Sequence, residues 1–432
     1  MIVHPYIQPN QDVYVYDDPT LEYKAVFVNE AFYFGASRAL GQPDCIYYNG
    51  NFYLSGYKLN TYDNQALIAK YNRANGITTA EVGSGTTPAN EPDDHPVPAV
   101  YVNQSTGYVY MIQNKYHNSY FRVFKSTSAE SITLTYSGEI TDGGASYITI
   151  VEASGSDITF VTRGKTGGTN NLWYCFACCT VNLDTLVYTH TQITSIDFAT
   201  NAVRHYPNAT PIYVYGTPTV YFMGINHRWE TNGYVYKISI LATSDWSTFT
   251  NYANTFSKDV IGVSPITEAE LESNCVFVGT DSTKTNNYTP IVSIQVDDNM
   301  FILYKKLTTT RFYISKIAYE GSITTFEITL DDAAFDQCYM YYNGTNIIMT
   351  FAVNDGSSNI DNAIFRVAGI NTDLTGYTLF ADLLETPRAA NTNLVSNFDD
   401  MPAGTYYPIM GAQKLNQEGM ITYYESNKSW SI

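Results

Sequence analysis

Basic residues are scarce in this sequence. Its 432 residues include 23 Lys and Arg against 41 Asp and Glu, which gives a formal net charge of -18. Because nucleic-acid backbones are bound by clustered Lys and Arg, the sequence predicts no nucleic-acid partner. A small basic pocket within an acidic protein still permits an anionic substrate.

Long apolar runs are also missing. No stretch approaches the roughly 18 consecutive apolar residues of a membrane-spanning helix, so we expect no membrane span. The N-terminus, MIVHPYIQPNQDVYVYDDP, has no positive region followed by an apolar one, and we therefore expect no signal peptide. If the protein acts outside a cell, we expect it to reach that location by a route not visible in the sequence. One such route is assembly into a phage tail or another part of a virion.

Cysteines are few for a chain of this length and predict no disulfide framework. The six are Cys45, Cys175, Cys178, Cys179, Cys275 and Cys338. The CFACC cluster contains a C-x-x-C spacing, but it lies in the apolar run LWYCFACCTV and no second pair stands at zinc-ligand distance. We interpret these residues as buried strand cysteines, with a metal or redox role as the alternative, and predict no cofactor.

Aromatic residues are abundant, with 39 Tyr and 21 Phe in a chain that is 44% hydrophobic. Tyr, Phe, Thr, Val and Ile suit the half-buried surface of a pleated sheet. Long runs of Ala, Leu, Glu and Lys, which would favour helices, are few. The composition therefore predicts an all-β protein.

A strand, a short polar turn and a second strand recur along the chain, as in CIYYNGNFYLSGY and CYMYYNGTNIIMTFAVND. Seven such hairpins are expected, near residues 45–57, 99–113, 147–164, 211–229, 290–306, 338–355 and 408–426. Further strands follow several of them. Three or four strands per repeat are typical of propeller blades, so we predict a seven-bladed β-propeller that forms a single domain over residues 1–432.

Three details complete this prediction. The N-terminal strand-like segment QDVYVY is a candidate to complete the last blade, and the intervals near 255–285 and 370–405 are expected to hold surface loops. A pair of β-sandwiches is the alternative architecture. It is disfavoured because no Pro/Gly/Ser-rich linker separates two halves.

Chemically useful residues recur at one end of three consecutive hairpins. Functional sites on propellers lie on the loops at one end of the channel, and antiparallel pairing brings the two outer ends of a hairpin together. The candidates are His95 with His117, Tyr147 with Arg163, and Tyr206 with His227 and Arg228. The alternative interpretation is structural, with tyrosines at the rim or core, solvated arginines and a turn histidine.

The residues DDHPVPAVYVNQSTGYVYMIQNKYH and the following FRVFKST resemble the signature of the BNR-4 type β-propellers, a group that includes the seven-bladed ulvan lyases. The resemblance extends through SYITI to FVTRGKTGG and through HYPNATPIYVY to INHRW, and TSDWSTFT resembles an incomplete Asp-box turn. It covers roughly residues 40 to 255. The resemblance implies a polysaccharide lyase that cleaves next to a uronic acid.

Site roles follow from this resemblance. It implies that His95 and Tyr147 form the proton-transfer pair and that Arg163 and His117 bind the substrate carboxylate. Tyr206, His227 and Arg228 would contact the substrate in neighbouring subsites.

These residue types suit β-elimination at a uronate. Removal of the weakly acidic C5 proton builds negative charge on the carboxylate, which fixed positive charge stabilises. The planar fork of Arg163 matches a carboxylate. A histidine has an ordinary pKa of roughly 6.5 and can accept the proton near neutral pH, while a tyrosine beside an arginine can act as base or protonate the leaving oxygen.

Other functions remain open on the sequence alone. A non-catalytic glycan-binding or structural propeller, such as a phage tail fibre or adhesin with virion assembly partners, would bind an acidic polysaccharide or cell-surface glycan without cleaving it. A sialidase-like glycosidase is disfavoured because it needs an arginine cluster. Asp93 and Asp94 are candidates for a structural calcium site, although turn formation is the simpler interpretation.

Overall fold

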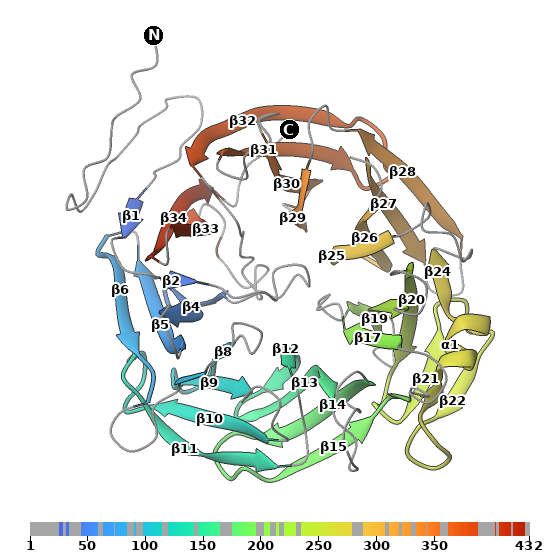
Figure 1. The fold of residues 1–432 in the computed structure, drawn as a ribbon, viewed down its shortest axis with the longest axis horizontal. Coiled ribbons are helices and arrows are strands. Elements are labelled where there is room, and N and C mark those ends of the chain that lie inside the picture. Colours follow the sequence, from blue (N-terminus) through green and yellow to red (C-terminus); the bar gives the residue numbers. More distant parts are fainter. Residues whose placement is uncertain are drawn as a thin grey trace.

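The described strands form eight sheets, and seven of these are arranged as blades around a ring in this computed structural model (Figure 1). The structure describes residues 26–28, 32–33, 45–58, 64–72, 74–83, 90–91, 98–114, 120–141, 146–164, 175–195, 203–207, 213–215, 220–229, 235–278, 288–306, 311–318, 322–329, 334–342, 344–354, 362–387, 402, 406–415 and 418–427. The ring confirms the predicted all-β, seven-bladed β-propeller. The alternative of two β-sandwiches is wrong.

Each blade is an antiparallel sheet in which chain order largely follows strand order from the channel outward. The first blade contains β2 (Phe32–Tyr33), β3 (Cys45–Tyr48), β4 (Asn51–Lys58), β5 (Asn64–Asn72), β6 (Gly76–Glu81) and β7 (Asn90–Glu91). The second contains β8 (Ala99–Val102), β9 (Val109–Asn114), β10 (Tyr120–Ser126) and β11 (Leu134–Thr141). The third contains β12 (Ser146–Ser154), β13 (Asp157–Gly164), β14 (Cys175–Asn182) and β15 (Tyr188–Gln192).

The fourth blade is the most elaborate, because its inner edge is split between two strands that both pair with β19. It contains β17 (Val203–Pro207), β18 (Tyr213–Tyr215), β19 (Val220–Trp229), β20 (Val235–Thr243), β21 (Thr248–Asn251), β22 (Ser257–Asp259) and β24 (Val276–Val278). The fifth contains β25 (Tyr288–Val296), β26 (Asn299–Lys306), β27 (Arg311–Ala318) and β28 (Ile323–Thr329). The sixth contains β29 (Ala334–Tyr342), β30 (Asn346–Asn354), β31 (Asn362–Asn371) and β32 (Thr378–Pro387).

The seventh blade closes the ring by combining both ends of the described chain. β33 (Tyr406–Leu415) pairs with β34 (Glu418–Asn427), and β34 pairs on its other side with β1 (Val26–Val28). An N-terminal strand therefore completes the last blade, as expected, but that strand is β1. The segment QDVYVY lies outside the described residues.

Turn residues explain the tight inner hairpins. In the first blade, Asn49 and Gly50 connect β3 to β4, and both have positive φ angles of 47° and 78°. Two-residue hairpin turns of this kind match the right-handed twist of the flanking strands, and Asn-Gly tolerates the left-handed backbone that they require.

The two intervals expected to be loops contain regular structure. Residues 255–285 include β22, β23 (Ile266–Thr267), α1 (Glu268–Asn274) and β24, and residues 370–405 include β32. β23 pairs in parallel with β16 (Thr194–Ser195), and α1 begins with a capping box between Thr267 and Glu270. The capping pair T-x-x-E was a signal for this helix that the loop interpretation overlooked.

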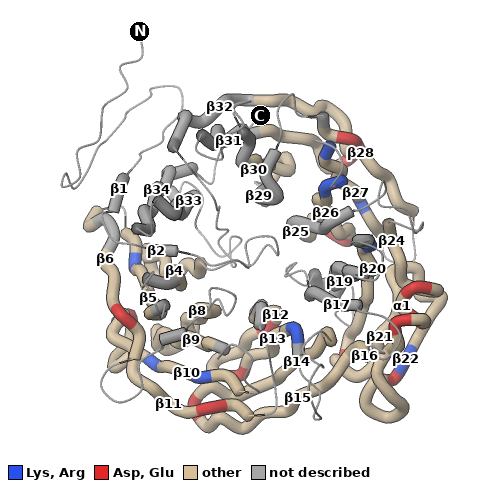
Figure 2. Tube along the Cα trace, in the orientation of Figure 1, with Lys and Arg blue, Asp and Glu red and all other residues tan. Residues whose placement is uncertain are grey.

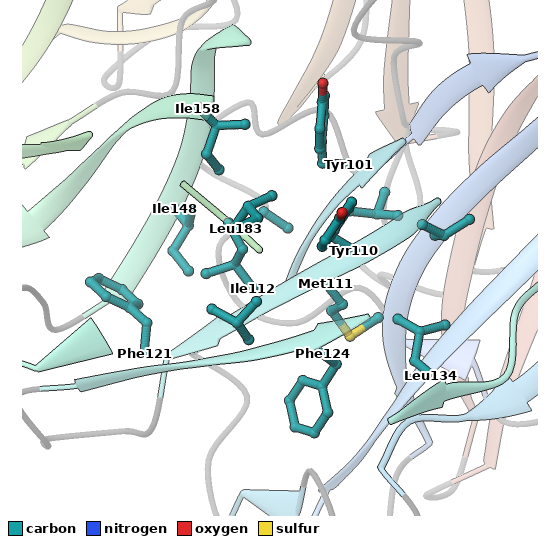
Figure 3. Close-up of a cluster of buried hydrophobic side chains, with 14 of the residues drawn as sticks. Tyr101, Tyr110, Met111, Ile112, Phe121, Phe124, Leu134, Ile148, Ile158 and Leu183 are labelled. Atoms are coloured by element: carbon teal, nitrogen blue, oxygen red, sulfur yellow. The ribbon is translucent and has the colours of Figure 1, made fainter. Parts of the chain in front are cut away.

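Apolar side chains fill the interfaces between neighbouring sheets. Between the second and third blades, Ile148 and Ile158 belong to the same cluster of buried side chains as Tyr110 and Ile112 (Figure 3). Phe121 and Phe160 from the two blades make an edge-to-face contact with ring centroids 5.0 Å apart. A blade has one neighbour on each face, so both faces of a sheet are buried.

Polar contacts reinforce the same interface on the face of the ring that carries the inner hairpin turns. Lys125 of β10 lies directly opposite Tyr110 of β9, with its ammonium 5.4 Å from the ring centroid. Its Nζ also lies 2.6 Å from Oδ1 of Asp184, in the β14–β15 turn of the next blade. Tyr110 Oη donates to the same oxygen at 2.7 Å, and Ser156 Oγ donates to Oδ2 at 2.6 Å.

This arrangement occurs at three interfaces between blades. In each case a lysine of the third strand lies opposite an aromatic residue of the second strand and contacts the outer turn of the following blade. The other two sets are Tyr53, Lys70 and Glu130 in blades one and two, and Phe301, Lys316 and Thr372 in blades five and six. The repeated lysine therefore fixes the spacing of adjacent sheets.

Asp184 gives this contact a predictable dependence on pH. Hydrogen bonds from Lys125 and Ser156 lower the pKa of the Asp184 carboxyl from 3.8 to about 2. A lowered pKa in the folded state contributes stability above pH 4 that is lost as the pH falls from about 4 to about 2. For a carboxylate that is 42% exposed, solvent screening reduces the contribution to on the order of 1 kcal/mol.

We therefore expect Asp184→Asn to lower the free energy of unfolding at pH 7 by on the order of 1 kcal/mol. The difference between variant and wild type should shrink toward zero as the pH falls from about 4 to about 2. Urea denaturation at several pH values measures both quantities. A difference that stays constant over this range would show that the ionised carboxylate is not what stabilises the interface.

Candidate functional site

The first pair of candidates belongs to segments that flank the second blade's inner hairpin. β8 and β9 are antiparallel, with Ala99 opposite Ile112. The segment before β8 and the segment after β9 therefore leave the sheet at the same end, away from the turn at residues 103–108. His95 and His117 themselves lie outside the described residues, and their convergence stays a prediction.

Arg163 is the candidate whose position is best defined. It lies near the end of β13, opposite Ser146 of β12 on one side and Phe176 of β14 on the other. Only 6% of its surface is exposed. A buried guanidinium must be compensated by negative charge or by acceptors, and the position of Arg163 puts such a charge at the end of the third blade.

Tyr147 is the second residue of β12 and so lies next to Ser146, the residue opposite Arg163. The β12–β13 register shifts between Ser146 and Thr149, and Tyr147 falls within this irregular stretch. Bulges re-aim residues next to functional sites. The backbone therefore brings Tyr147 and Arg163 to the same end of one hairpin, as the sequence predicts.

The sequence predicts that Tyr206 precedes a strand and that His227 and Arg228 follow its partner strand, but the structure places these three candidates inside strands. Tyr206 belongs to β17, and His227 and Arg228 belong to β19. Tyr206 lies opposite Asn226, His205 lies opposite His227, and Arg204 lies opposite Arg228. The sequence interpretation missed β17 because this strand is short. Its five residues, VRHYP, include polar ones and form no apolar run.

The third blade, which carries Arg163, packs against the fourth blade, which carries Tyr206, His227 and Arg228. Val161, Phe176 and Leu241 pack in one core cluster between the two sheets. Because Phe176 lies opposite Arg163, Arg163 is on the face that meets the fourth blade. β17 in turn contacts both β13 and β14.

Alternation along β20 places Lys237 on the face of the fourth blade that packs against the third blade. Leu241 faces the third blade, whereas Ile238 and Ile240 face the fifth, so Lys237 shares the face of Leu241. Lys237 is 5% exposed and forms an ion pair with Glu272 of α1. It also lies directly opposite His227.

His205, His227 and Lys237 therefore lie opposite one another across β17, β19 and β20. Tyr206 and Asn226 form the neighbouring pair in the same ladder. Sequence reasoning missed His205 and Lys237. The motif RHY signals His205, but only the register reveals that it is opposite His227.

The cysteine cluster belongs to the sheet core, as predicted. Cys175, Cys178 and Cys179 are buried residues of β14. Burial raises the pKa of the Cys178 thiol to about 12, so this group is a neutral thiol near pH 7. Its environment is that of an inert structural cysteine.

Within the described ranges, no three His, Cys, Asp or Glu side chains gather closely enough to hold a metal ion. Asp93 and Asp94, the calcium candidates, lie outside these ranges. Nor does any helix in the described ranges have the length and apolar character needed to cross a membrane.

Hydrogen bonds to Asp245 and from Thr243 hold the β20–β21 turn, which belongs to the segment TSDWSTFT. Oδ1 of Asp245 accepts from the backbone N–H groups of Ser247 and Thr248 at 2.9 Å and 2.7 Å. Thr243 Oγ1 donates to the carbonyl of Thr248 at 2.7 Å, and Trp246 has a positive φ of 58°. Hydrogen bonds from the turn lower the pKa of the Asp245 carboxyl despite its partial burial.

Comparison with known proteins identifies the fold. No protein-family model matches the sequence, and no curated protein sequence matches it. Among solved structures, the polysaccharide lyase Uly1 is similar with a TM-score of 0.58 and 12% identity, over 94% of this chain and 99% of that chain.

Two further propellers resemble the chain less. The Dos1 propeller has a TM-score of 0.48 and 7% identity, over 89% of this chain and 93% of that chain. The α-L-arabinanase of Penicillium chrysogenum has a TM-score of 0.45 and 13% identity, over 81% and 98%. At 12% identity, the similarity to Uly1 supports the β-propeller fold alone.

Proposed function

We propose that this propeller binds a uronate-containing polysaccharide and cleaves it by β-elimination. The observation that carries the proposal is Arg163, a buried arginine at the end of β13, with Tyr147 at the same end of the hairpin. The similarity over nearly the whole chain to a polysaccharide lyase of the same fold supports it. So do the motifs that resemble the ulvan lyases.

In the proposed reaction, Arg163 binds the uronate carboxylate and stabilises the charge that develops on it. The bond from C5 to hydrogen breaks, a C4–C5 double bond forms, and the glycosidic oxygen at C4 leaves with a proton. His95 and Tyr147 would transfer these protons, and His117 would assist Arg163 at the carboxylate. Electrostatic groups of this kind each contribute about 10²- to 10³-fold to the rate.

Tyr206, His227 and Arg228 are proposed to contact sugar residues next to the cleaved bond. Their blade adjoins the third blade through β17 and β13, so a polysaccharide that reaches Arg163 also passes the inner edge of the fourth blade. Recognition by several blades is typical of sites formed by loops at one end of a propeller.

The direct test is incubation with a panel of uronate polysaccharides, with ultraviolet absorbance as the signal of the unsaturated product. We expect wild-type protein to produce this signal and Tyr147→Phe to lose at least about 10²-fold of the rate, because the hydroxyl proton is removed while the ring remains. Tyr252→Phe, a change in a half-buried tyrosine of the fourth blade's outer turn, is the matched control and should retain the wild-type rate.

The outcomes of this test separate two functions. Binding without any absorbance change across the panel would replace the lyase proposal by a glycan-binding one, such as a virion tail fibre or adhesin. Neither binding nor cleavage would contradict both. Isothermal titration with the same polysaccharides measures binding independently of cleavage.

A further inference from the structure

The second strand of the fifth blade ends in two adjacent lysines. β26 closes with Lys305 and Lys306, and both side chains are partly exposed. β13 of the third blade, which ends next to Arg163, is likewise the second strand that follows an inner hairpin turn. Because the blades repeat one strand order around the ring, Arg163 and the two lysines lie at the same end of the ring, with the fourth blade between them (Figure 1). We name this the open end, and the end with the inner hairpin turns the turn end.

Lys305 has a counterpart at the turn end of the same two strands. Lys305 of β26 lies opposite Phe312 of β27, with its Nζ 5.9 Å from the ring centroid. Lys316 of β27 lies opposite Phe301 of β26, with its Nζ 5.7 Å from that ring centroid. Residues 301 and 305 are four apart in one strand and therefore share a face of the sheet. The two lysines thus have the same aromatic support on the same face, and they differ in the end of the ring at which they lie.

The surroundings of Lys316 at the turn end are acidic. Its Nζ donates to the carbonyl of Thr372 at 3.2 Å. Hydrogen bonds from Thr375, together with the charge of Lys316, lower the pKa of the Asp373 carboxyl. A neighbouring carboxylate therefore balances the charge of this lysine.

Charge is separated between the two ends over the third, fourth and fifth blades. Among the described side chains of these blades, the carboxylates at the turn end include Glu152, Asp157, Asp184, Asp245, Asp297 and Asp298. The described basic residues at the open end are Arg163, Lys237, Lys305, Lys306 and Arg311. Figure 2 shows those of the fifth blade on β26 and β27.

Two of these basic residues have a carboxylate partner in the structure. Glu272 pairs with Lys237. Glu327 pairs with Arg311, whose side chain is 52% exposed. In a protein with a formal net charge of -18, such a separation of charge favours the approach of a polyanion to the open end over the turn end.

We propose that Lys305 and Lys306 form an anion-binding subsite for the polysaccharide, two blades along the ring from Arg163, so that the substrate is a chain with acidic groups on more than one sugar. This inference rests on the proposed function for the nature of the ligand. A lysine ammonium is a point charge on a flexible stem, which suits a charged chain of variable geometry better than one fixed carboxylate. The lysine pair therefore contributes to affinity, whereas the planar fork of Arg163 is left to the reacting sugar.

The test measures dissociation constants by isothermal titration of the full-length protein with dextran sulfate, a polyanion that contains no uronate and so is not a substrate for the proposed elimination. Neutral dextran is the blank. Lys305→Met/Lys306→Met should raise the dissociation constant about 3- to 10-fold and weaken its dependence on salt, because fewer counterions are released on binding.

Lys316→Met is the matched control, because it removes a lysine with the same aromatic support from the turn end of the same strands. It should leave the dissociation constant within about two-fold of the wild-type value. Lys305→Arg/Lys306→Arg keeps both charges and should also bind within about two-fold, which separates a loss of charge from a loss of folded protein. The subsite is overturned if wild type does not bind dextran sulfate at low salt, if the Met pair binds as wild type does, or if Lys316→Met or the Arg pair loses as much affinity as the Met pair.

Kinetics separates this proposal from the lyase proposal. If a uronate polysaccharide is cleaved, Lys305→Met/Lys306→Met should raise KM several-fold with little change in kcat, since the lysines bind substrate and transition state alike. If none is cleaved but the Met pair alone weakens binding of dextran sulfate, the lyase proposal fails and the subsite stands. Cleavage with an unchanged KM in the Met pair would leave the lyase proposal standing and overturn the subsite.

Discussion

Arg163→Ala is expected to reduce kcat for polysaccharide cleavage by about 10²- to 10³-fold. The side chain is buried at the end of β13, on the face that meets the fourth blade. The uronate carboxylate gains charge in the transition state, so a fixed cation stabilises the transition state more than the bound substrate. The loss should therefore appear in kcat and not only in KM, which initial-rate measurements distinguish.

Arg163→Lys sharpens this prediction. Lysine keeps the charge but lacks the planar fork that binds a carboxylate through two parallel hydrogen bonds, so only partial activity should return. Arg311→Ala is the matched control, because Arg311 is 52% exposed and forms an ion pair with Glu327 on β28. If Arg163→Ala keeps the full rate while remaining folded, Arg163 does not bind the reacting group.

Phe160→Ala is expected to lower the free energy of unfolding by about 3–5 kcal/mol. Phe160 has no exposed surface and makes the edge-to-face contact with Phe121 that joins the second and third blades. Truncation removes this contact and leaves a cavity that the flanking sheets cannot close without breaking their strand pairing. Chemical denaturation monitored by circular dichroism measures the change.

The control for this effect is Val187→Ala in the β14–β15 turn. Val187 is 72% exposed, and its truncation should change the free energy of unfolding by no more than about 0.5 kcal/mol. Comparable losses in the two variants would mean that packing between blades is not what sets the stability of the ring.

The fold class was predictable because propeller blades depend on local patterns. Alternating aromatic and β-branched residues predict strands, and the Asn49–Gly50 turn has the positive φ angles that this dipeptide favours. What the pattern did not reveal was non-local. β1 was not predicted as the closing strand because its partner, β34, lies at the far end of the sequence.

The candidate site was predictable only in part for the same reason. The ends of one hairpin can be read from sequence, and Tyr147 and Arg163 do lie at one end of β12 and β13. The pairing of His205 with His227 depends on the register of β17, and Lys237 enters through the third strand of its blade. Residues that meet across strands in this way leave no spacing signal in the chain.

The closing strand pair also determines when the ring can form during synthesis on the ribosome. β1 ends at Val28 and its partner β34 begins at Glu418, a separation of 418 − 28 = 390 residues. At roughly 5–20 residues per second, β34 is translated roughly 20–80 s after β1. Until then β1 cannot find its native partner, and the nascent chain presents an open arc of blades with two unpaired outer faces. The ring therefore cannot close before β34, the last described strand, has been translated.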